Sequence, residues 1–329
     1  MKRSGPAVLI ECAAIAACLC AFASSAAAQG EYPLRTVRII VPSSPAGGND
    51  TVSRLIAQGL TERWGRQVVV DNRPGASTMI GGELVARAAP DGYTLLMGGN
   101  SLAINPATFK KIPFDAQRDF APITQVMLMP NLLVSHPSLP ARDLRELIAL
   151  TRARPGQLLY ATAGHGSNPH LMMELYASMA KVRMLHVPYK GSAPGIVDLI
   201  AGHVALMAPN MLQVMPHVRS GRLRAYGVTS AARVSAAQDI PTIAEAGLPG
   251  YEDFTINALF APAATPREIL LRLHGEVAKA AGTPELRKRF PEQGIELVAS
   301  NSPEDFTAYI KTEVARYAKL AREAGIKAE

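Results

Sequence analysis

The chain has 329 residues, 48% of them hydrophobic and 19% charged, with a formal net charge of +7. This length fits about two domains, and the composition is typical of a soluble α/β protein with a hydrophobic core. The basic residues stand singly and are not interleaved with aromatic residues, which argues against nucleic-acid binding.

The first 28 residues have the features of a secretory signal peptide. Lys2 and Arg3 give a basic start, residues 7–25 form an apolar run, and residues 26–28 are alanines that suit a signal peptidase. Two alternatives stay open: a membrane anchor, and a lipoprotein site that would tether the mature chain through Cys18. We expect export of an untethered chain.

The three cysteines, Cys12, Cys18 and Cys20, all lie in this segment. Cleavage after Ala28 would leave a mature chain without cysteine, which excludes disulfides, thiolate metal sites and cysteine nucleophiles. Beyond residue 28 the sequence has no apolar run long enough to span a bilayer.

The rest of the chain alternates between predicted strands and helices. Apolar and β-branched runs predict strands at 37–41, 68–70, 94–97, 132–134, 158–161, 184–187, 204–207, 224–228 and 256–261. Amphipathic periodicity predicts one helix that begins with a cap at Asn49 or Asp50 and ends before Gly65, and another that begins after the loop at 164–167. Further helices are predicted at 80–88, 142–152, 193–201, 266–281, 284–290 and 303–324. This alternation predicts parallel strand pairing with right-handed crossovers.

The domain organisation follows from the absence of any low-complexity linker in the sequence. We expect two lobes that share the chain by crossing back and forth. Residues 29–131 with 254–329 would form the first lobe, and residues 132–253 the second. The hinges would lie near 129–133 and 253–256.

Two glycine-rich loops each join a strand directly to a helix: Pro45-Ala46-Gly47-Gly48-Asn49-Asp50 and Gly164-His165-Gly166-Ser167-Asn168-Pro169. Glycine lets the backbone approach a ligand closely, and the first N–H groups of a helix lack partners within the helix. The helix dipole adds partial positive charge, so such a terminus receives a carboxylate or phosphate without Arg or Lys. Facing each other across a cleft, the two loops would grip both ends of a small diacid.

The same loops also have a purely structural interpretation. Asp50 and Asn168 would then cap their helices, with Pro169 at the first helical position. Both interpretations can hold together, because a cap uses only one or two of the available donors. Lys190 likewise has two interpretations, as a cation for a carboxylate or as a solvated turn residue.

Catalytic interpretations agree less well with the sequence. His165 and His170 lack a common metal-binding spacing, and residues 164–167 lack the G-x-S-x-G frame of a hydrolase. The same loop lacks the third glycine of a dinucleotide site. We therefore expect no catalytic residue, no metal ion and no cofactor, with a secreted hydrolase using His165 or His170 as the alternative.

Several segments, in order along nearly the whole mature chain, carry a resemblance to a known family. They are Tyr32-Pro33, Val37-Arg38-Ile39-Ile40-Val41-Pro42, Asn72-Arg73-Pro74-Gly75-Ala76, Ala89-Pro90-Asp91-Gly92-Tyr93-Thr94-Leu95-Leu96, Arg154-Pro155-Gly156, His170-Leu171, His186-Val187-Pro188-Tyr189-Lys190-Gly191 and Pro241-Thr242-Ile243-Ala244-Glu245-Ala246-Gly247. Together they resemble the substrate-binding receptors of tripartite tricarboxylate transporters, the Bug-type proteins.

The resemblance implies an α/β, two-lobed periplasmic-binding-protein fold, type II-like, with the ligand cleft between the lobes. It implies organic acids as ligands, held largely by backbone groups and waters of the two loops. By position it assigns the site to Ser43, Ala46, Gly47, Gly48, Asn49, Asp50, Ala76, Ser77, Asn100, Ser101, Gly164, His165, Gly166, Ser167, His170 and Asn210.

This chain departs from the usual family pattern at five places, Ser43, Ala46, His165, Ala205 and Pro209-Asn210. The departures bear on the ligand more than on the fold. The function implied is that of a monomeric periplasmic receptor that delivers a small organic acid to membrane transporter subunits through transient contact. A receptor that passes the liganded state to a signalling partner is the alternative.

Overall fold

The computed structural model describes residues 32–45, 48–284, 290, 295–297, 300–326 and 328. The chain divides into two compact units, Met1–Arg35 and Thr36–Glu329. In the first unit the described residues are 32–35, with a cis bond between Tyr32 and Pro33. The predicted signal peptide lies outside the described residues, as do residues 285–289 of the helix predicted at 284–290. None of the helices in the described part of the chain is both long and apolar enough to cross a membrane.

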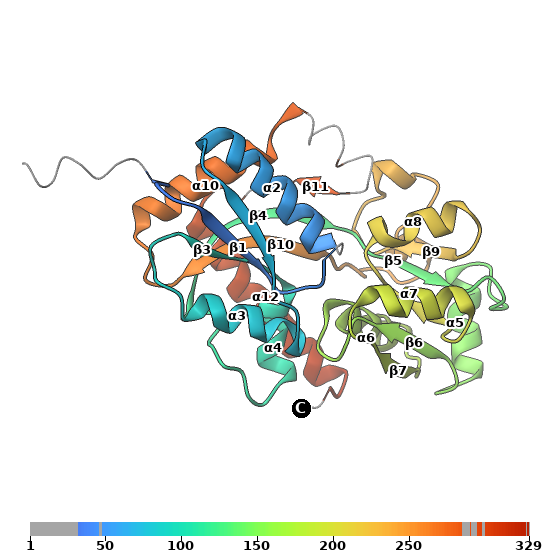
Figure 1. Ribbon diagram of the computed structural model, residues 1–329. Coiled ribbons are helices and arrows are strands. Elements are labelled where there is room, and N and C mark those ends of the chain that lie inside the picture. The colour runs from blue at the N-terminus through green and yellow to red at the C-terminus, as the bar shows by residue number, and fades with distance from the viewer. Residues whose placement is uncertain are drawn as a thin grey trace, which may run out of the picture. The chain divides into compact units, whose positions relative to one another are not determined.

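The first sheet of the larger unit has the strand order β11-β4-β10-β3-β1-β2 (Figure 1). Its strands are β1 (Val37–Val41), β2 (Val68–Asn72), β3 (Thr94–Gly99), β4 (Phe120–Met129), β10 (Thr255–Pro262) and β11 (Glu296–Leu297). β1 pairs in parallel with β2 and β3, whereas β10 lies antiparallel between β3 and β4. This sheet is the centre of the first lobe.

The second sheet has the order β7-β6-β8-β5-β9. Its strands are β5 (Leu132–Ser135), β6 (Leu159–Thr162), β7 (Leu185–Pro188), β8 (Leu206–Met207) and β9 (Arg224–Val228). β6 is parallel to β7 and β8, but β5 is antiparallel to β8 and β9. This sheet is the centre of the second lobe, and the chain passes between the sheets from β4 to β5 and from β9 to β10.

The prediction of parallel pairing is confirmed for β1 with β2 and β3 and for β6 with β7 and β8, and it is wrong for the other pairs in both sheets. The antiparallel pairs involve three strands: β11, which pairs with β4, and β5 and β10, which are the strands that follow the passages between lobes. β5 begins at Leu132, three residues after β4 ends at Met129, so no crossover helix connects them. Parallel pairing needs such a crossover, whereas a strand arriving from the other sheet can enter in either direction.

Helices cover both sheets. They are α2 (Gly48–Trp64), α3 (Met79–Ala86), α4 (Asn100–Thr108), α5 (Leu144–Ala153), α6 (Asn168–Ala180), α7 (Ser192–Ala201), α8 (Met211–Arg219), α9 (Ile243–Ala246), α10 (Arg267–Ala281) and α12 (Pro303–Glu323). Capping fixes several starts: Asp143 accepts from the Glu146 N–H ahead of α5, and Ser302 does the same for α12. α2 ends at Trp64, before Gly65 at φ +60°, as predicted.

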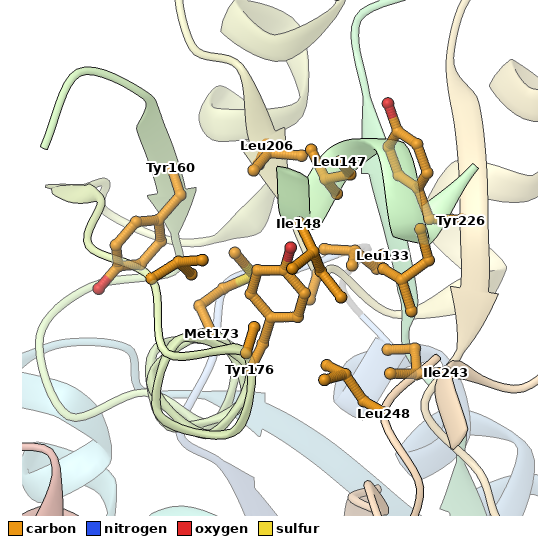
Figure 2. Packing of buried hydrophobic residues seen from close by; sticks show 14 of the residues in the cluster. Leu133, Leu147, Ile148, Tyr160, Met173, Tyr176, Leu206, Tyr226, Ile243 and Leu248 are labelled. Atoms are coloured by element: carbon orange, nitrogen blue, oxygen red, sulfur yellow. The ribbon is translucent and has the colours of Figure 1, made fainter. Parts of the chain in front are cut away.

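The second lobe has a hydrophobic core on each face of its sheet. One core lies under α5, α6 and α9 and includes Leu147, Tyr160, Met173 and Tyr176, all at most 1% exposed (Figure 2). The other lies under α7 and α8. In Figure 2 the Tyr160 hydroxyl points away from the rest of the core, and it donates to the carboxylate of Glu174. The first lobe has a corresponding core between its sheet, α3 and α12.

Candidate functional site

The first-lobe loop leads from β1 into α2. Its central residues, Ala46 and Gly47, lie outside the described residues, so their predicted role stays a prediction. α2 begins at Gly48, which places Asn49 and Asp50 inside its first turn; the prediction that either one is the cap is wrong. The Asp50 carboxylate is buried and pairs with Arg54 one turn later, at 3.0 Å. An acidic group in the first turn is stabilised by the helix dipole.

Two polar atoms at this loop are buried without a hydrogen-bond partner among the described residues: Ser43 Oγ and Asn210 Nδ2. Asn210 is the N-cap of α8, and its Oδ1 accepts from the Leu212 N–H at 3.0 Å. A Cβ added at Gly48 would lie 3.9 Å from Asn210 Cγ, so the start of α2 approaches the start of α8. A buried donor without a partner costs about 1–3 kcal/mol, which favours a position where a bound molecule satisfies it.

The turn after β2 has an unusual backbone. Ala76, Ser77 and Thr78 have φ values of +44°, +49° and +76°, a run of left-handed residues without glycine. Each such residue costs about 1 kcal/mol or more, and strain of this kind gathers at functional sites. Thr78 Oγ1 donates to Ser101 Oγ at 2.9 Å, and Asn105 Nδ2 donates to the Ser77 carbonyl at 3.0 Å. The turn is therefore held against the start of α4.

The second-lobe loop leads from β6 into α6 and turns on two glycines. Gly164 has φ +127° and Gly166 has φ +66°, both of which favour glycine. Ser167 is the N-cap of α6, but its hydroxyl donates to the Gly164 carbonyl at 2.7 Å instead of capping the helix. The prediction that Asn168 caps α6 is wrong. Asn168 is the first helical residue, and its side-chain amide donates to the Phe254 carbonyl at 3.0 Å.

The two lobes touch through predicted site residues. Ser77 Oγ donates to the His165 carbonyl at 2.9 Å. The Phe109 ring meets the His165 imidazole edge-on, with centroids 5.7 Å apart. A Cβ added at Gly166 would lie 2.7 Å from Thr108 Oγ1. The structure thus brings the strained turn of the first lobe onto the glycine loop of the second.

Three imidazoles gather behind this contact, and we call His165, His170 and His186 the imidazole cluster. The rings of His170 and His186 are stacked with centroids 4.0 Å apart, and His165 lies 5.2 Å from His170. Burial, with a smaller contribution from the neighbouring imidazoles, lowers the pKa of His170 to about 3 and that of His186 to about 4. At neutral pH both rings are therefore uncharged.

Asn100, another predicted site residue, makes only structural contacts in the described part of the chain. Its amide nitrogen donates to the Phe254 carbonyl at 2.9 Å and to the Tyr317 hydroxyl at 2.8 Å. Its amide oxygen accepts from the Ile256 N–H at 2.7 Å. All the hydrogen bonds of this side chain thus go to the passage between lobes and to α12, and its contact with a solute stays a prediction.

The same network reaches the second lobe. The Tyr317 hydroxyl lies 3.2 Å from Asn168 Oδ1 and 3.2 Å from Asp253 Oδ1, and donates to one of them. Arg316 pairs with the other oxygen of Asp253 at 3.1 Å. We call Asn100, Asn168, Asp253 and Tyr317 the hinge network, because its members join α4, α6, α12 and the segment before β10.

His186 and Phe109 are the residues at the site that sequence reasoning missed as contacts. His186 stands in the motif His186-Val187-Pro188-Tyr189-Lys190-Gly191, which at the level of sequence carried only the family resemblance. The parallel pairing of β6 and β7 places His186 beside Tyr160, and the His170 ring stacks on both. Phe109 follows α4, a helix that the sequence did not predict. Lys190 is exposed, as its solvated interpretation expects.

A small cavity inside the first lobe is a separate feature. It measures about 10 Å³ and is lined by Gly99, Ala103, Ile256, Phe260 and Tyr317 among others. This volume holds at most one water molecule, so the cavity is no solute site.

Sequence comparison places the chain among transport receptors. A profile described as "Tripartite tricarboxylate transporter family receptor" matches residues 52–326. Protein BugT of Bordetella pertussis is 36% identical over 298 residues, 90% of this chain and 91% of that protein. The UPF0065 protein in the tcbD-tcbE intergenic region of Pseudomonas sp. (strain P51) is 38% identical over 290 residues, 88% of this chain and 86% of that protein.

Solved structures agree with this result. R. palustris Rpa4515 with adipate is 37% identical, with a TM-score of 0.86, over 91% of this chain and 100% of that chain. MatC from Rhodopseudomonas palustris with bound malate is 31% identical, with a TM-score of 0.79, over 88% of this chain and 99% of that chain. The two-lobed α/β fold predicted from the sequence is confirmed.

Proposed function

The chain belongs to the tripartite tricarboxylate transporter receptor family, and we propose from this premise that it captures a small organic carboxylate between its two lobes in the periplasm. The family is one of solute-binding receptors, not of enzymes. A receptor returns its ligand unchanged, so the proposal includes no catalytic step.

The observation that carries the proposal is the approach of segments from different lobes at two places, the turn at 76–78 with the loop at 164–167 and the start of α2 with the start of α8. Ser77 of the first lobe bonds the His165 carbonyl of the second, and Asn210 Nδ2 is a buried donor without a described partner near Gly48. Backbone N–H groups at helix starts and such side-chain donors suit the oxygens of a carboxylate. The relatives solved with adipate and with malate support a dicarboxylate.

The proposal includes the division into lobes. Residues 29–131 with 254–329 would move as one body and residues 132–253 as the other, hinged at 129–133 and 253–256. The distribution of strands between the two sheets supports these bounds, since β4 and β5, and β9 and β10, belong to different sheets. We propose further that the chain is exported and cleaved after Ala28. The mature protein would act as a monomer and deliver its solute to membrane transporter subunits.

A thermal-shift screen tests the proposal. Mono-, di- and tricarboxylates, with adipate and malate among them, are compared with amino acids and aromatic acids. A matching acid binds only the folded form and stabilises it by about 2.7 kcal/mol at a concentration 100 times its Kd. We expect the largest rise in Tm from a dicarboxylate. Absence of any shift from every acid, together with hydrolysis of an ester or amide, would overturn the receptor assignment.

A further inference from the structure

The imidazole cluster has a composition that carboxylate capture does not require. His165, His170 and His186 come from one loop, one helix and one strand, and their candidate ligand nitrogens all lie within 4.8 Å of one another. We propose that these three side chains form a binding site for a divalent transition-metal ion of the zinc type. The site is independent of the identity of the organic acid.

The spacing of the nitrogens is close to that of a metal site. Tetrahedral zinc with Zn–N distances of about 2.0–2.1 Å sets its nitrogen ligands roughly 3.4 Å apart. The three nitrogens must therefore approach by about an ångström, and the stacked rings of His170 and His186 must tilt so that their lone pairs converge. His165 can follow such a movement because Gly164 and Gly166 flank it, both at positive φ.

The protein orients the rings of His170 and His186 through contacts to one nitrogen of each, and the other nitrogen is the one that an ion would bind. Nε2 of His186 lies 2.6 Å from Thr162 Oγ1. Nε2 of His170 faces Glu174 Oε1 at 4.0 Å, and Glu174 also accepts from Tyr160. Nδ1 of His170 accepts a long hydrogen bond from the Gly166 N–H at 3.3 Å, which a bound ion would replace. Histidines that bind metals are usually oriented by such a partner on the second nitrogen.

Imidazole is also a suitable ligand for a metal cation. An imidazole binds a metal ion through the lone pair of its neutral form. Among the common divalent ions, imidazole favours zinc, copper and nickel over magnesium and calcium.

A site with three histidines keeps a fourth position for a further ligand. In this chain that position would be on the side of the loop where Ser77 and Phe109 reach His165 from the first lobe. An oxygen of a bound solute or of water would fill it. The metal ion and the solute would therefore be neighbours, and each would increase the affinity for the other.

Calorimetric titration of Zn²⁺ into metal-stripped, full-length protein without a histidine tag tests the proposal. We expect saturable binding of a single ion, and no comparable binding of Mg²⁺. His165→Asn keeps a polar side chain on the loop and should weaken Zn²⁺ binding by about tenfold or more, since it removes a ligand. The matched control is His203→Asn, because the side chain of His203 is 70% exposed and lies outside the cluster.

Every outcome of this experiment decides the proposal. Saturable Zn²⁺ binding that His165→Asn weakens by about tenfold or more, and His203→Asn leaves unchanged, supports it. Absence of saturable binding, a smaller loss in His165→Asn, or an equal loss in His203→Asn overturns it. The thermal shift caused by carboxylates, repeated in EDTA, separates this outcome from the proposed function: a shift that persists without metal leaves carboxylate capture standing.

Discussion

The imidazole cluster, in which His170 is buried and the other two rings are half-buried, and the buried hinge network are built in opposite ways. In the hinge network each donor meets an acceptor: Asn100 alone makes three hydrogen bonds of 2.7–2.9 Å. In the imidazole cluster the rings of His170 and His186 face each other at 4.0 Å instead of bonding. The members of the first group bond one another, whereas the rings of the second form hydrogen bonds with Thr162 and the Gly166 N–H instead of with one another.

This difference separates a structural role from a binding role. Satisfied buried networks fix one arrangement of the elements that they join, because breaking any member leaves the others unpaired. Neutral rings with few internal bonds cost stability and gain it back only when something binds them. The hinge network thus belongs to the stability of the fold, and the imidazole cluster to its ligands.

The largest expected effect is at the hinge network. Asn100→Ala would leave the Ile256 N–H and the Phe254 carbonyl without their bonds to this side chain, and would remove the bond to Tyr317. We expect the free energy of unfolding to fall by about 4 kcal/mol. Urea denaturation measures it. Asn301→Ala, at an exposed position, is the control and should change the free energy of unfolding by less than about 0.5 kcal/mol.

Equal stability of Asn100→Ala and Asn301→Ala would contradict this role for the hinge network. In that case the hinge network would not contribute to the stability of the fold.

The imidazole cluster should make the free energy of unfolding depend on pH. His170 and His186 take up protons in the folded state only near pH 3 to 4, but in the unfolded state near their ordinary pKa of 6.5. Lowering the pH below 6.5 therefore adds protons to the unfolded state alone, and the stability falls until about pH 4. At face value these pKa shifts amount to about 5 kcal/mol over that range. Because His186 is half-buried and solvent screens its charge, protein in EDTA should lose less, on the order of 3 kcal/mol.

Because carboxylates also affect stability in acid, the comparison with a variant isolates the histidines. His186→Asn should flatten the fall between pH 6.5 and 4, as measured by urea denaturation at each pH. An identical pH profile in the wild-type protein and the variant would mean that His186 titrates in the folded protein as it does in the unfolded chain.

The sequence predicted the positions of the strands better than the way in which the strands pair. The run Val37–Val41 is a strand with the predicted bounds, and so is Arg224–Val228. α4 and α8 were missed, and each contains a proline, Pro106 and Pro216, which local rules treat as a helix breaker. Packing against the rest of the lobe outweighs that local cost.

At the candidate site, too, local features could be predicted from the sequence but long-range contacts could not. Glycine loops and helix starts are visible in a sequence, because they depend on neighbouring residues. The partner of Asn168 is not visible, because Phe254 and Tyr317 are 86 and 149 residues away. The approach of His186 to His170 likewise depends on strand pairing, which local patterns do not specify.

The contact between lobes can be broken at Gly166 with a matched control. Gly166→Ala and Gly156→Ala both place an alanine at positive φ, +66° and +72°, and pay a similar backbone cost. Only at Gly166 would the new Cβ collide with the other lobe, 2.7 Å from Thr108 Oγ1, whereas nothing lies within 4 Å at Gly156. We expect Gly166→Ala to lower affinity for the matching carboxylate by roughly 30-fold, about 2 kcal/mol.

Titration of both glycine variants with the carboxylate that gives the largest thermal shift measures this effect. Gly156→Ala should bind like the wild-type protein. If both variants bind alike, approach of the lobes at Gly166 plays no part in binding.

The smallest effect is expected from the hydroxyl of Ser77, which forms a single neutral hydrogen bond to the His165 carbonyl. Ser77→Ala should weaken carboxylate binding by about 1 kcal/mol, roughly fivefold. Ser77→Gly removes the same hydroxyl but relieves the backbone at φ +49°, so it should lose similar affinity while unfolding at higher urea concentration than Ser77→Ala. Wild-type affinity in Ser77→Ala would show that this bond does not favour the liganded form; the strained turn would then position backbone groups alone.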